Sequence, residues 1–284
     1  MKAASFQYQL PEDLHTALQL INSNDIDALP LAGGQSLMPM MNFRISQPDL
    51  LVDLNKIDSL KKIEYEKNFI KIGSMVKYSE MEKSDLIKEK IPLINHVIPY
   101  VAHSAIRNRG TIGGSVALAD PAAEFPSLLI SLDATIELMN IDGTREIKSD
   151  DFFTGIFETE RKTNELITSI NIPINNLPKK YGFYEITRRH GDYAMAGAFV
   201  TTDGDQNEFT NSRVVLFAVS TKPLRMIEIE KYLNGKSLND PSVIEDAIDL
   251  ISDNDFEIDL HNDMEAKKTY AKVSLKRAIG VLNG

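Results

Sequence analysis

Residues 107–124 read RNRGTIGGSVALADPAAE, and together with residues 31–39, LAGGQSLMP, they decide the fold. Each segment carries a glycine pair, which removes side chains so that a ligand can approach the backbone, and consecutive N–H groups of such a turn can bind phosphate oxygens in a concavity. Ser36, Thr111 and Ser115 add hydroxyl donors. Two such turns, from distant positions in the chain, suit a diphosphate with two ends.

Neither segment matches the better-known phosphate loops. No lysine follows Gly114, as G-x-x-x-x-G-K-[ST] requires, and no G-x-G-x-x-G opens a helix after a strand. Glu124 has two interpretations, which the residues alone leave open. It either accepts hydrogen bonds from ribose hydroxyls or is a first-turn helix acid that the helix dipole favours.

Composition excludes several function classes. The formal net charge is -10, which disfavours a nucleic-acid partner. Cysteine is absent, so this chain cannot hold an Fe–S cluster with thiolates. The five histidines show no metal-binding spacing, and we expect no metal site. No stretch suits a signal peptide or a membrane span, which predicts a cytoplasmic chain without membrane insertion.

Apolar patterning predicts strands, helices and two hairpins in the first 175 residues. The hairpins are expected at 62–74, turning at Lys67-Asn68, and at 134–147, turning at Asp142-Gly143. Further strands are expected at 6–10, 28–34, 50–54 and 165–174. Helices are expected from Pro11, at 36–44 as a short or irregular connection, from Tyr78 to about Arg107 with breaks at Pro92 and Pro99, and at 124–134.

The rest of the chain follows a composition break at 175–180, NNLPKK, where we place a domain boundary. Two alternating segments, 196–202 and 212–220, predict strands, and helices are expected around 242–252 and 263–282. Strands are grouped with strands and helices with helices, which predicts an α+β fold and disfavours a Rossmann fold.

Four strings resemble the FAD-binding medium subunit of the xanthine dehydrogenase and carbon monoxide dehydrogenase family, the molybdenum hydroxylases. They are LAGGQSLMPMMNFRISQPDLLVDLNKI, AIRNRGTIGGSVALADPAAEFPSLL, DFFTGIF and RRHGDYAMAGA. The resemblance covers essentially the whole chain, in order. It implies an α+β, PCMH-type FAD-binding domain, similar to vanillyl-alcohol oxidase, at 1–176, with subdomains at about 1–56 and 57–176. A CO-dehydrogenase-flavoprotein C-terminal α+β domain would follow at 177–284.

The resemblance also implies the cofactor-binding residues. The first diphosphate loop would be Ala32, Gly33, Gly34, Gln35 and Ser36, and the second would be Thr111, Ile112, Gly113, Gly114 and Ser115. Glu124 would hold the adenosine ribose, Asp120 lies in the same loop, and Tyr193 would lie against the isoalloxazine ring, where aromatic stacking is favourable. A core tyrosine is the alternative for Tyr193. We expect no catalytic acid, base or nucleophile in this chain.

The implied function is an electron relay. Partner subunits, one large with a molybdopterin cofactor and one small with [2Fe-2S] clusters, would pass electrons to FAD in this chain, which delivers them to an external acceptor. The assembly would be a heterotrimer or its dimer, inactive as the isolated chain. A stand-alone NAD(P)H-dependent flavoenzyme, such as an enolpyruvylglucosamine reductase, and a flavin-free scaffold are the alternatives. The substrate and the acceptor (oxygen, NAD, quinone or another carrier) stay open.

Four arginines form two basic spots in this acidic chain. Three roles are open for these side chains, which could bind phosphates, contact a partner subunit or simply be solvated: Arg107, Arg109, Arg188 and Arg189.

Overall fold

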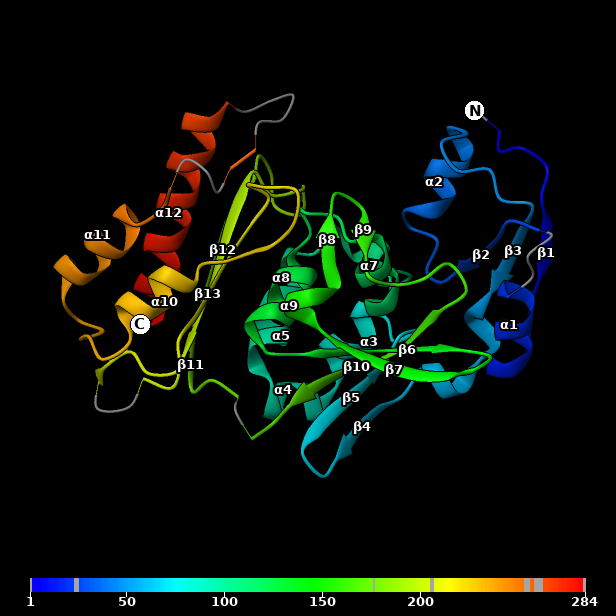
Figure 1. The fold of residues 1–284 in the computed structure, drawn as a ribbon, viewed down its shortest axis with the longest axis horizontal. Coiled ribbons are helices and arrows are strands. Elements are labelled where there is room, and N and C mark those ends of the chain that lie inside the picture. Colours follow the sequence, from blue (N-terminus) through cyan, green and yellow to red (C-terminus); the bar gives the residue numbers. More distant parts are fainter. Residues whose placement is uncertain are drawn as a thin grey trace.

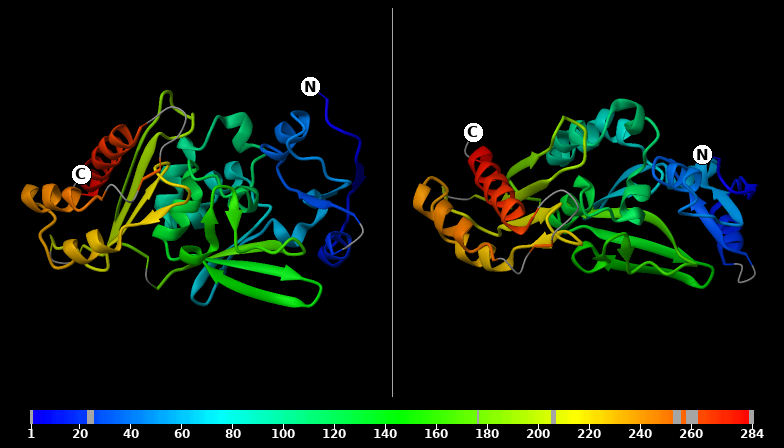
Figure 2. Two further views of the ribbon diagram at one scale, coloured as in Figure 1. Left: turned by 45° about the horizontal axis from the view of Figure 1, so that its top comes forward. Right: turned by 90° about the horizontal axis from the view of Figure 1, so that it is seen from above.

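The computed structural model describes residues 2–22, 26–175, 177–204, 207–252, 256–257 and 263–282. The chain is α+β, as the sequence predicts. Three lobes follow one another along the longest axis, with the N-terminal lobe at one end and the C-terminal lobe at the other (Figure 1). The views in Figure 2 show the same succession of lobes. Each lobe is built around its own sheet.

The first lobe has a small parallel sheet in the order β1-β3-β2. Its elements are β1 (Gln7–Gln9), α1 (Leu14–Ile21), β2 (Ala28–Leu31), α2 (Leu37–Asn42) and β3 (Leu50–Asp53). Two short 3₁₀ turns follow, η1 (Leu54–Lys56) and η2 (Asp58–Leu60). Each predicted element is present, but the lobe is a local β-α-β-α-β succession rather than grouped strands. The α-helical connections bring the chain back to the end of the sheet at which the previous strand began, so the strands run parallel.

The start of α1 lies later than the pattern predicts. Asp13, rather than Pro11, ends the non-helical chain, and its carboxylate accepts a hydrogen bond from the Thr16 N–H at 2.9 Å. Such a cap satisfies an N–H group that has no partner within the helix. Leu18 and Ile21 then pack on the buried face of β3.

The middle lobe is built around an antiparallel sheet in the order β4-β5-β10-β6-β7. Both predicted hairpins are confirmed, with tips at Glu66↔Phe69 and Asn140↔Gly143. The strands are β4 (Ile63–Glu66), β5 (Phe69–Gly73), β6 (Thr135–Asn140), β7 (Gly143–Lys148) and the central β10 (Leu166–Pro173). A separate two-stranded hairpin, β8 (Phe153–Gly155) and β9 (Glu158–Thr159), projects from this lobe (Figure 1).

Short helices fill the middle lobe between its strands. The region from Tyr78 to Arg107 is helical and breaks at Pro92 and Pro99 as predicted. It is also interrupted at Ser84, whose hydroxyl caps the next helix, and at 101–103. A helix that the sequence did not predict runs through the second glycine pair. The elements are α3 (Tyr78–Lys83), α4 (Asp85–Lys90), α5 (Pro92–Val97), η3 (Ile98–Tyr100), α6 (Ser104–Arg107), α7 (Ile112–Leu118), α8 (Glu124–Ser131) and α9 (Ser149–Phe152).

The third lobe is an antiparallel sheet in sequence order, covered on one face by helices. Its strands are β11 (Lys180–Ile186), β12 (Ala196–Thr202), β13 (Arg213–Phe217) and β14 (Leu224–Arg225). Two helices lie close to their predicted positions and α10 was not predicted: α10 (Ile227–Leu233), α11 (Pro241–Asp249) and α12 (Met264–Leu282). The sequence IEIEKYL of α10 alternates like a strand, which explains the omission.

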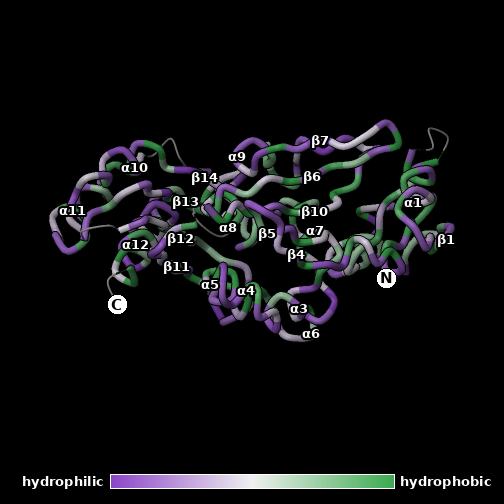
Figure 3. The backbone as a smooth tube through the Cα atoms, turned by 90° about the horizontal axis from the view of Figure 1, so that it is seen from below, coloured by the Kyte–Doolittle hydropathy of each residue, from purple (hydrophilic) through white to green (hydrophobic). Residues whose placement is uncertain are grey.

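The other face of the third sheet packs on α8. In Figure 3, α8 lies between β12 and β13 on one side and β5 and β10 on the other. Phe183, Phe199 and Phe217 of the sheet share one buried cluster with Phe125 and Leu128 of α8. The middle and third lobes therefore share a hydrophobic core.

Candidate functional site

The two glycine segments, distant in sequence, lie against each other. A Cβ on Gly33 would lie 2.2 Å from the carbonyl oxygen of Arg109 and 2.9 Å from the Cα of Gly110. A Cβ on Gly114 would lie 3.6 Å from the Cβ of Ala32. The first glycine loop (residues 32–36) therefore contacts the second glycine loop (residues 110–115), at the junction of the first and middle lobes.

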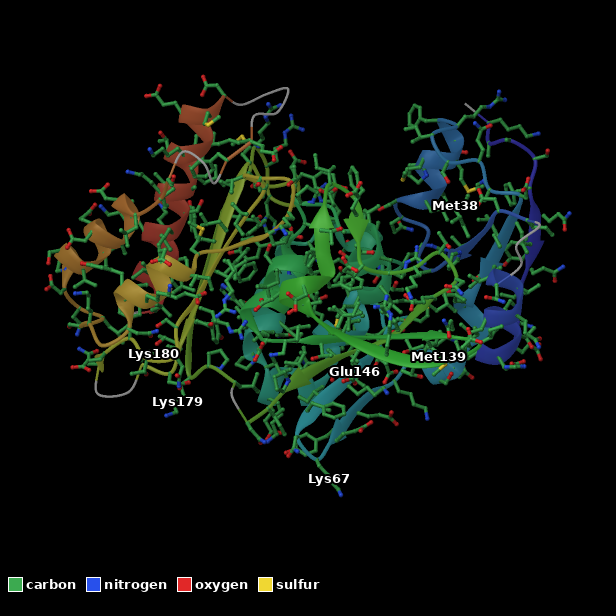
Figure 4. All side chains as sticks on the ribbon, viewed as in Figure 1. Met38, Lys67, Met139, Glu146, Lys179 and Lys180 are labelled. Atoms are coloured by element: carbon green, nitrogen blue, oxygen red, sulfur yellow. The ribbon has the colours of Figure 1, made fainter. Side chains whose placement is uncertain are left out.

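The first glycine loop presents unused amides. Gly34 has a φ of +71°, a conformation that glycine adopts without strain. Met38, labelled on α2 in Figure 4, packs over Gly34, and its Cγ would lie 3.2 Å from a Cβ added there. Within the described residues, the N–H groups of the loop donate no hydrogen bond: Gly33, Gly34, Gln35 and Ser36. Free, adjacent N–H groups of this kind are suited to phosphate oxygens.

The second glycine loop uses its amides differently. The N–H of Gly113 donates to the carbonyl of Ser74 at 2.8 Å, and that of Gly114 donates to the hydroxyl of Thr111 at 3.1 Å. Ile112 and Ser115 also donate to backbone carbonyls. The expectation that both loops offer free amides is therefore wrong for Ile112, Gly113, Gly114 and Ser115 of the second loop, because Val76, Ser74 and Thr111 accept their hydrogen bonds.

Close packing explains the glycines of α7. A Cβ on Gly113 would lie 2.5 Å from the Cβ of Ser74, so only glycine allows α7 to approach the chain that follows β5. The side chains of this loop add the hydroxyls of Thr111 and Ser115, of which that of Thr111 already accepts the Gly114 N–H. The second loop therefore shapes the site through packing and side chains.

Acidic residues lie beyond α7. The Asp120 carboxylate accepts a hydrogen bond from the Ala122 N–H at 2.9 Å, and burial raises its pKa. Glu124, the first residue of α8, is 7% exposed, and burial together with the charge of Asp120 raises its pKa to about 7. It is thus a first-turn helix acid, and its role as an acceptor for ribose hydroxyls stays a prediction.

Two further residues of this region were not found from the sequence. Glu185, on β11, is 8% exposed, and neither carboxylate oxygen has a hydrogen-bond partner among the described residues. Burial and the charge of Glu124 raise the pKa of Glu185 to about 8. Tyr78, also buried, packs on Gly110 and meets Phe125 edge to face at 4.7 Å. A glutamate or tyrosine in such segments gives no sequence signal of burial.

Tyr193 places an aromatic ring at the edge of this region. Its side chain is 66% exposed, so it is not a core tyrosine. Its hydroxyl lies beside Asp120; desolvation of that hydroxyl and then the charges of Asp120 and Glu124 raise the pKa of Tyr193. An exposed aromatic ring of this kind is available to stack on a ligand.

The four arginines separate into two kinds. Arg107 donates to the carbonyl oxygens of Val101 and Ala102 at 3.2 and 2.8 Å, so it ties α6 to the segment that precedes it. The other three are exposed: Arg109, Arg188 and Arg189.

Candidate metal ligands do not gather in the part of the chain that the structure describes. No group of three or more side chains able to hold a metal occurs among the described residues, and His261 lies outside them. No helix in the described ranges is both long and apolar enough to span a bilayer.

Comparison with known proteins decides the family. A family model described as the FAD binding domain in molybdopterin dehydrogenase matches residues 4–175. A second, the CO dehydrogenase flavoprotein C-terminal domain, matches residues 181–280. The chain belongs to the FAD-binding medium subunits of the molybdenum hydroxylases. Its oxidoreductase class and its cofactor, FAD, follow from that membership.

Relatives of this flavoprotein family match most of the chain. The glyceraldehyde dehydrogenase medium chain of Sulfolobus acidocaldarius is 37% identical over 86% of each chain. The quinoline 2-oxidoreductase structure from Pseudomonas putida 86 has 32% identity and a TM-score of 0.94, covering 100% of this chain and 99% of that one. The structure of carbon monoxide dehydrogenase from Hydrogenophaga pseudoflava has 31% identity and a TM-score of 0.93, covering 99% and 98%.

The residues present fit FAD. A glycine turn with free amides suits the diphosphate, a buried carboxylate suits ribose hydroxyls, and an exposed aromatic ring suits a flavin face. These features surround the contact between the two glycine loops.

Proposed function

We propose that this medium subunit binds FAD where its two glycine loops meet and relays electrons between partner subunits and an external acceptor. The observation that carries the proposal is the set of unused N–H groups at Gly33, Gly34, Gln35 and Ser36, directly against the second loop. These amides would donate hydrogen bonds to the diphosphate oxygens. The Thr111 and Ser115 hydroxyls would add donors from the other side.

The rest of the cofactor follows from neighbouring side chains. Glu124, with Asp120 in the same segment, would accept hydrogen bonds from the adenosine ribose. The wall beneath the cofactor would be formed by Ile112, Gly113 and Gly114, because their amides are engaged within the protein. Tyr193 would lie against the isoalloxazine ring, with its hydroxyl beside Asp120.

FAD supplies the redox chemistry, accepting electrons singly and discharging them in pairs. The protein holds the cofactor and shapes its surroundings. Because the chain contains no cysteine, iron–sulfur clusters must be carried by another chain. Several relatives are themselves named medium chains or medium subunits, such as the carbon monoxide dehydrogenase medium chain of Hydrogenophaga pseudoflava. We therefore propose a small [2Fe-2S] subunit and a large molybdenum-cofactor subunit as partners, in a heterotrimer or its dimer.

Spectroscopy and activity of purified chains test this proposal. The chain alone should be yellow and should oxidise neither NAD(P)H with a small substrate nor a molybdenum-hydroxylase substrate. Joined to the large and small subunits, it should undergo flavin bleaching when substrate is added. Activity of the isolated chain with NAD(P)H would instead support a stand-alone flavoenzyme, and a colourless chain that takes up no FAD would support a scaffold.

The division of the chain is also a proposal. We infer an FAD-binding domain at 1–176, with subdomains at about 1–56 and 57–176, and a C-terminal domain at 177–284. The separate sheets and the ranges of the two family matches support it. A cytoplasmic location stays a prediction.

A further inference from the structure

A chain of hydrogen bonds runs from the N-terminal strand to the first glycine loop. The Tyr8 hydroxyl donates to the Asp53 carboxylate at 2.6 Å, and the same carboxylate accepts from the Asn55 side-chain amide at 2.7 Å. That amide donates in turn to the Ala32 carbonyl at 3.1 Å. We call Tyr8, Asp53 and Asn55 the loop anchor.

The sheet of the first lobe places the loop anchor. β1 and β2 both pair with β3 in parallel, and Leu31, the last residue of β2, stands opposite Asp53. The first glycine loop therefore leaves the sheet at the edge where Asp53 ends β3. Asp53 is 8% exposed, and its carboxylate also caps η1 by accepting from the Asn55 N–H at 2.8 Å.

The orientation of the Asn55 amide follows from its neighbours. Both nearby atoms, the Ala32 carbonyl oxygen and the Asp53 carboxylate oxygen, are acceptors, so the nitrogen of the amide must face them. Both of its hydrogens are then used. One N–H donates to Asp53, which fixes the Asn55 side chain, and the other N–H then points to the Ala32 carbonyl of the glycine loop.

Holding a carbonyl also fixes an N–H. A trans peptide is planar, so its C=O and N–H point in opposite directions. With the Ala32 carbonyl held by Asn55, the Gly33 N–H points away from the loop anchor. The Gln35 side chain donates to the Gly33 carbonyl at 2.8 Å, which fixes the Gly34 N–H in the same way.

We propose that Asn55, held by Asp53 and Tyr8, and Gln35 are positioning residues that present the Gly33 and Gly34 amides to the FAD diphosphate. Glycine has no side chain to restrict its peptides, so without these two amide donors the loop would sample other orientations. The inference rests on the proposed function, since it takes the diphosphate to lie at this loop. It adds residues outside the glycine segments to the binding site.

Titration of the deflavinated full-length chain with FAD tests the inference. Asn55→Ala should weaken FAD binding about tenfold, the size expected for one or two lost hydrogen bonds. Asn55→Asp should weaken it further, because a carboxylate would face two acceptors. Gln35→Met should also weaken it. Asn164→Ala is the matched control, because its side-chain amide donates to Asn22 at 3.2 Å, away from the loop.

A second readout separates positioning from loss of fold. In protein labelled with ¹⁵N-glycine, the Gly33 and Gly34 amide signals should move when FAD binds, and Asn55→Ala should change the Gly33 signal before FAD is added. The unfolding midpoint of the deflavinated variant should equal that of the control. If Asn55→Ala does not fold, Tyr8→Phe removes only the distal hydrogen bond and should weaken FAD binding about twofold.

The outcomes distinguish the inference from the proposed site. Ser36→Asp places a negative charge at the loop and should strongly reduce FAD affinity, whereas the control Asn164→Ala should not. If Ser36→Asp weakens binding but Asn55→Ala leaves both affinity and the Gly33 signal unchanged, the positioning role is overturned. If Ser36→Asp also binds FAD normally, the diphosphate lies elsewhere and the proposed site itself fails.

Discussion

The backbone of Gly33 lies directly against the carbonyl oxygen of Arg109, with 2.2 Å between that oxygen and the place where a Cβ would stand. This contact joins the first lobe to the middle lobe at the proposed cofactor site. Because both partners are backbone, neither can move aside as a flexible side chain would. The relative placement of the two glycine loops therefore depends on the absence of a side chain at residue 33.

Gly33→Ala should separate the two loops. Overpacking against backbone costs about 1–3 kcal/mol, and we expect a loss of stability in that range together with a drop in FAD affinity of about tenfold or more. Chemical unfolding and FAD titration measure the two effects. Gly280→Ala is the control, since a Cβ there meets nothing within 4 Å and lies in α12. Equal behaviour of the two variants would contradict the contact.

Glu185→Gln should change how stability depends on pH. The unfolded carboxyl titrates near 4.5 and the folded one has a pKa of about 8, so between these values the folded protein holds a proton that the unfolded chain has lost. The free energy of unfolding should therefore fall as pH rises through this window and level off above about pH 8. Glutamine carries no charge, so the variant should show a flatter profile.

Urea unfolding of the deflavinated protein from about pH 5 to about pH 8.5 measures this difference. At about pH 8.5, the Glu185→Gln variant should have a free energy of unfolding roughly 2–4 kcal/mol higher than that of the parent chain. Glu208→Gln, at an exposed position of the same lobe, should leave the profile unchanged. A parent profile that rises toward the upper end would contradict the burial of Glu185 as a neutral acid.

Tyr193→Ala should weaken FAD binding and alter the flavin absorption spectrum. Stacking contributes about 1 kcal/mol, equivalent to roughly fivefold in affinity. Tyr193→Phe keeps the ring and loses only the hydroxyl beside Asp120, so it should retain most of the affinity. Absorption spectra, FAD titration and the rate of flavin reduction in the assembled complex compare the two. Unchanged flavin content and reduction in the alanine variant would exclude stacking by Tyr193.

Arg213→Met should loosen the contact between the middle and third lobes. Arg213, on β13, forms ion pairs with Asp133 at 2.6 Å and Asp150 at 3.5 Å and donates to the Ile130 carbonyl at 3.0 Å. Its side chain is 19% exposed, so a loss of about 2–3 kcal/mol is expected, less than for a fully buried pair.

Guanidinium unfolding measures the effect of Arg213→Met against Lys231→Met. The Lys231–Glu228 pair is exposed, with 67% and 76% of the two side chains accessible, and such pairs contribute about 0–1 kcal/mol. Similar losses in the two variants would show that the ion pairs of Arg213 do not stabilise the lobe contact.

The sequence predicted the elements whose patterns are local. The hairpins at 62–74 and 134–147 follow from alternation and polar turn residues, and the helix expected around 263–282 is α12. α7 was missed because two glycines lower helix propensity, whereas Thr111 caps the helix and packing on Ser74 requires a glycine. Tertiary contact decided this element.

The candidate site was likewise predicted only in part from the sequence. The glycine segments were found because their composition is unusual, and the structure brings them together. The engagement of the Gly113 and Gly114 amides was not foreseen, because it depends on partners such as Ser74. Glu185 and Asn55 were missed because a glutamate in a strand and an asparagine after one usually face solvent.

The central claim is that FAD lies where the two glycine loops touch, with its diphosphate on the amides of the first. A crystal structure of the flavin-loaded chain tests this most directly. We predict diphosphate oxygens within hydrogen-bond distance of the Gly33 and Gly34 nitrogens, ribose hydroxyls at Glu124 and the flavin ring on Tyr193. Electron density for the diphosphate away from residues 32–36, with those amides facing solvent, would contradict the account.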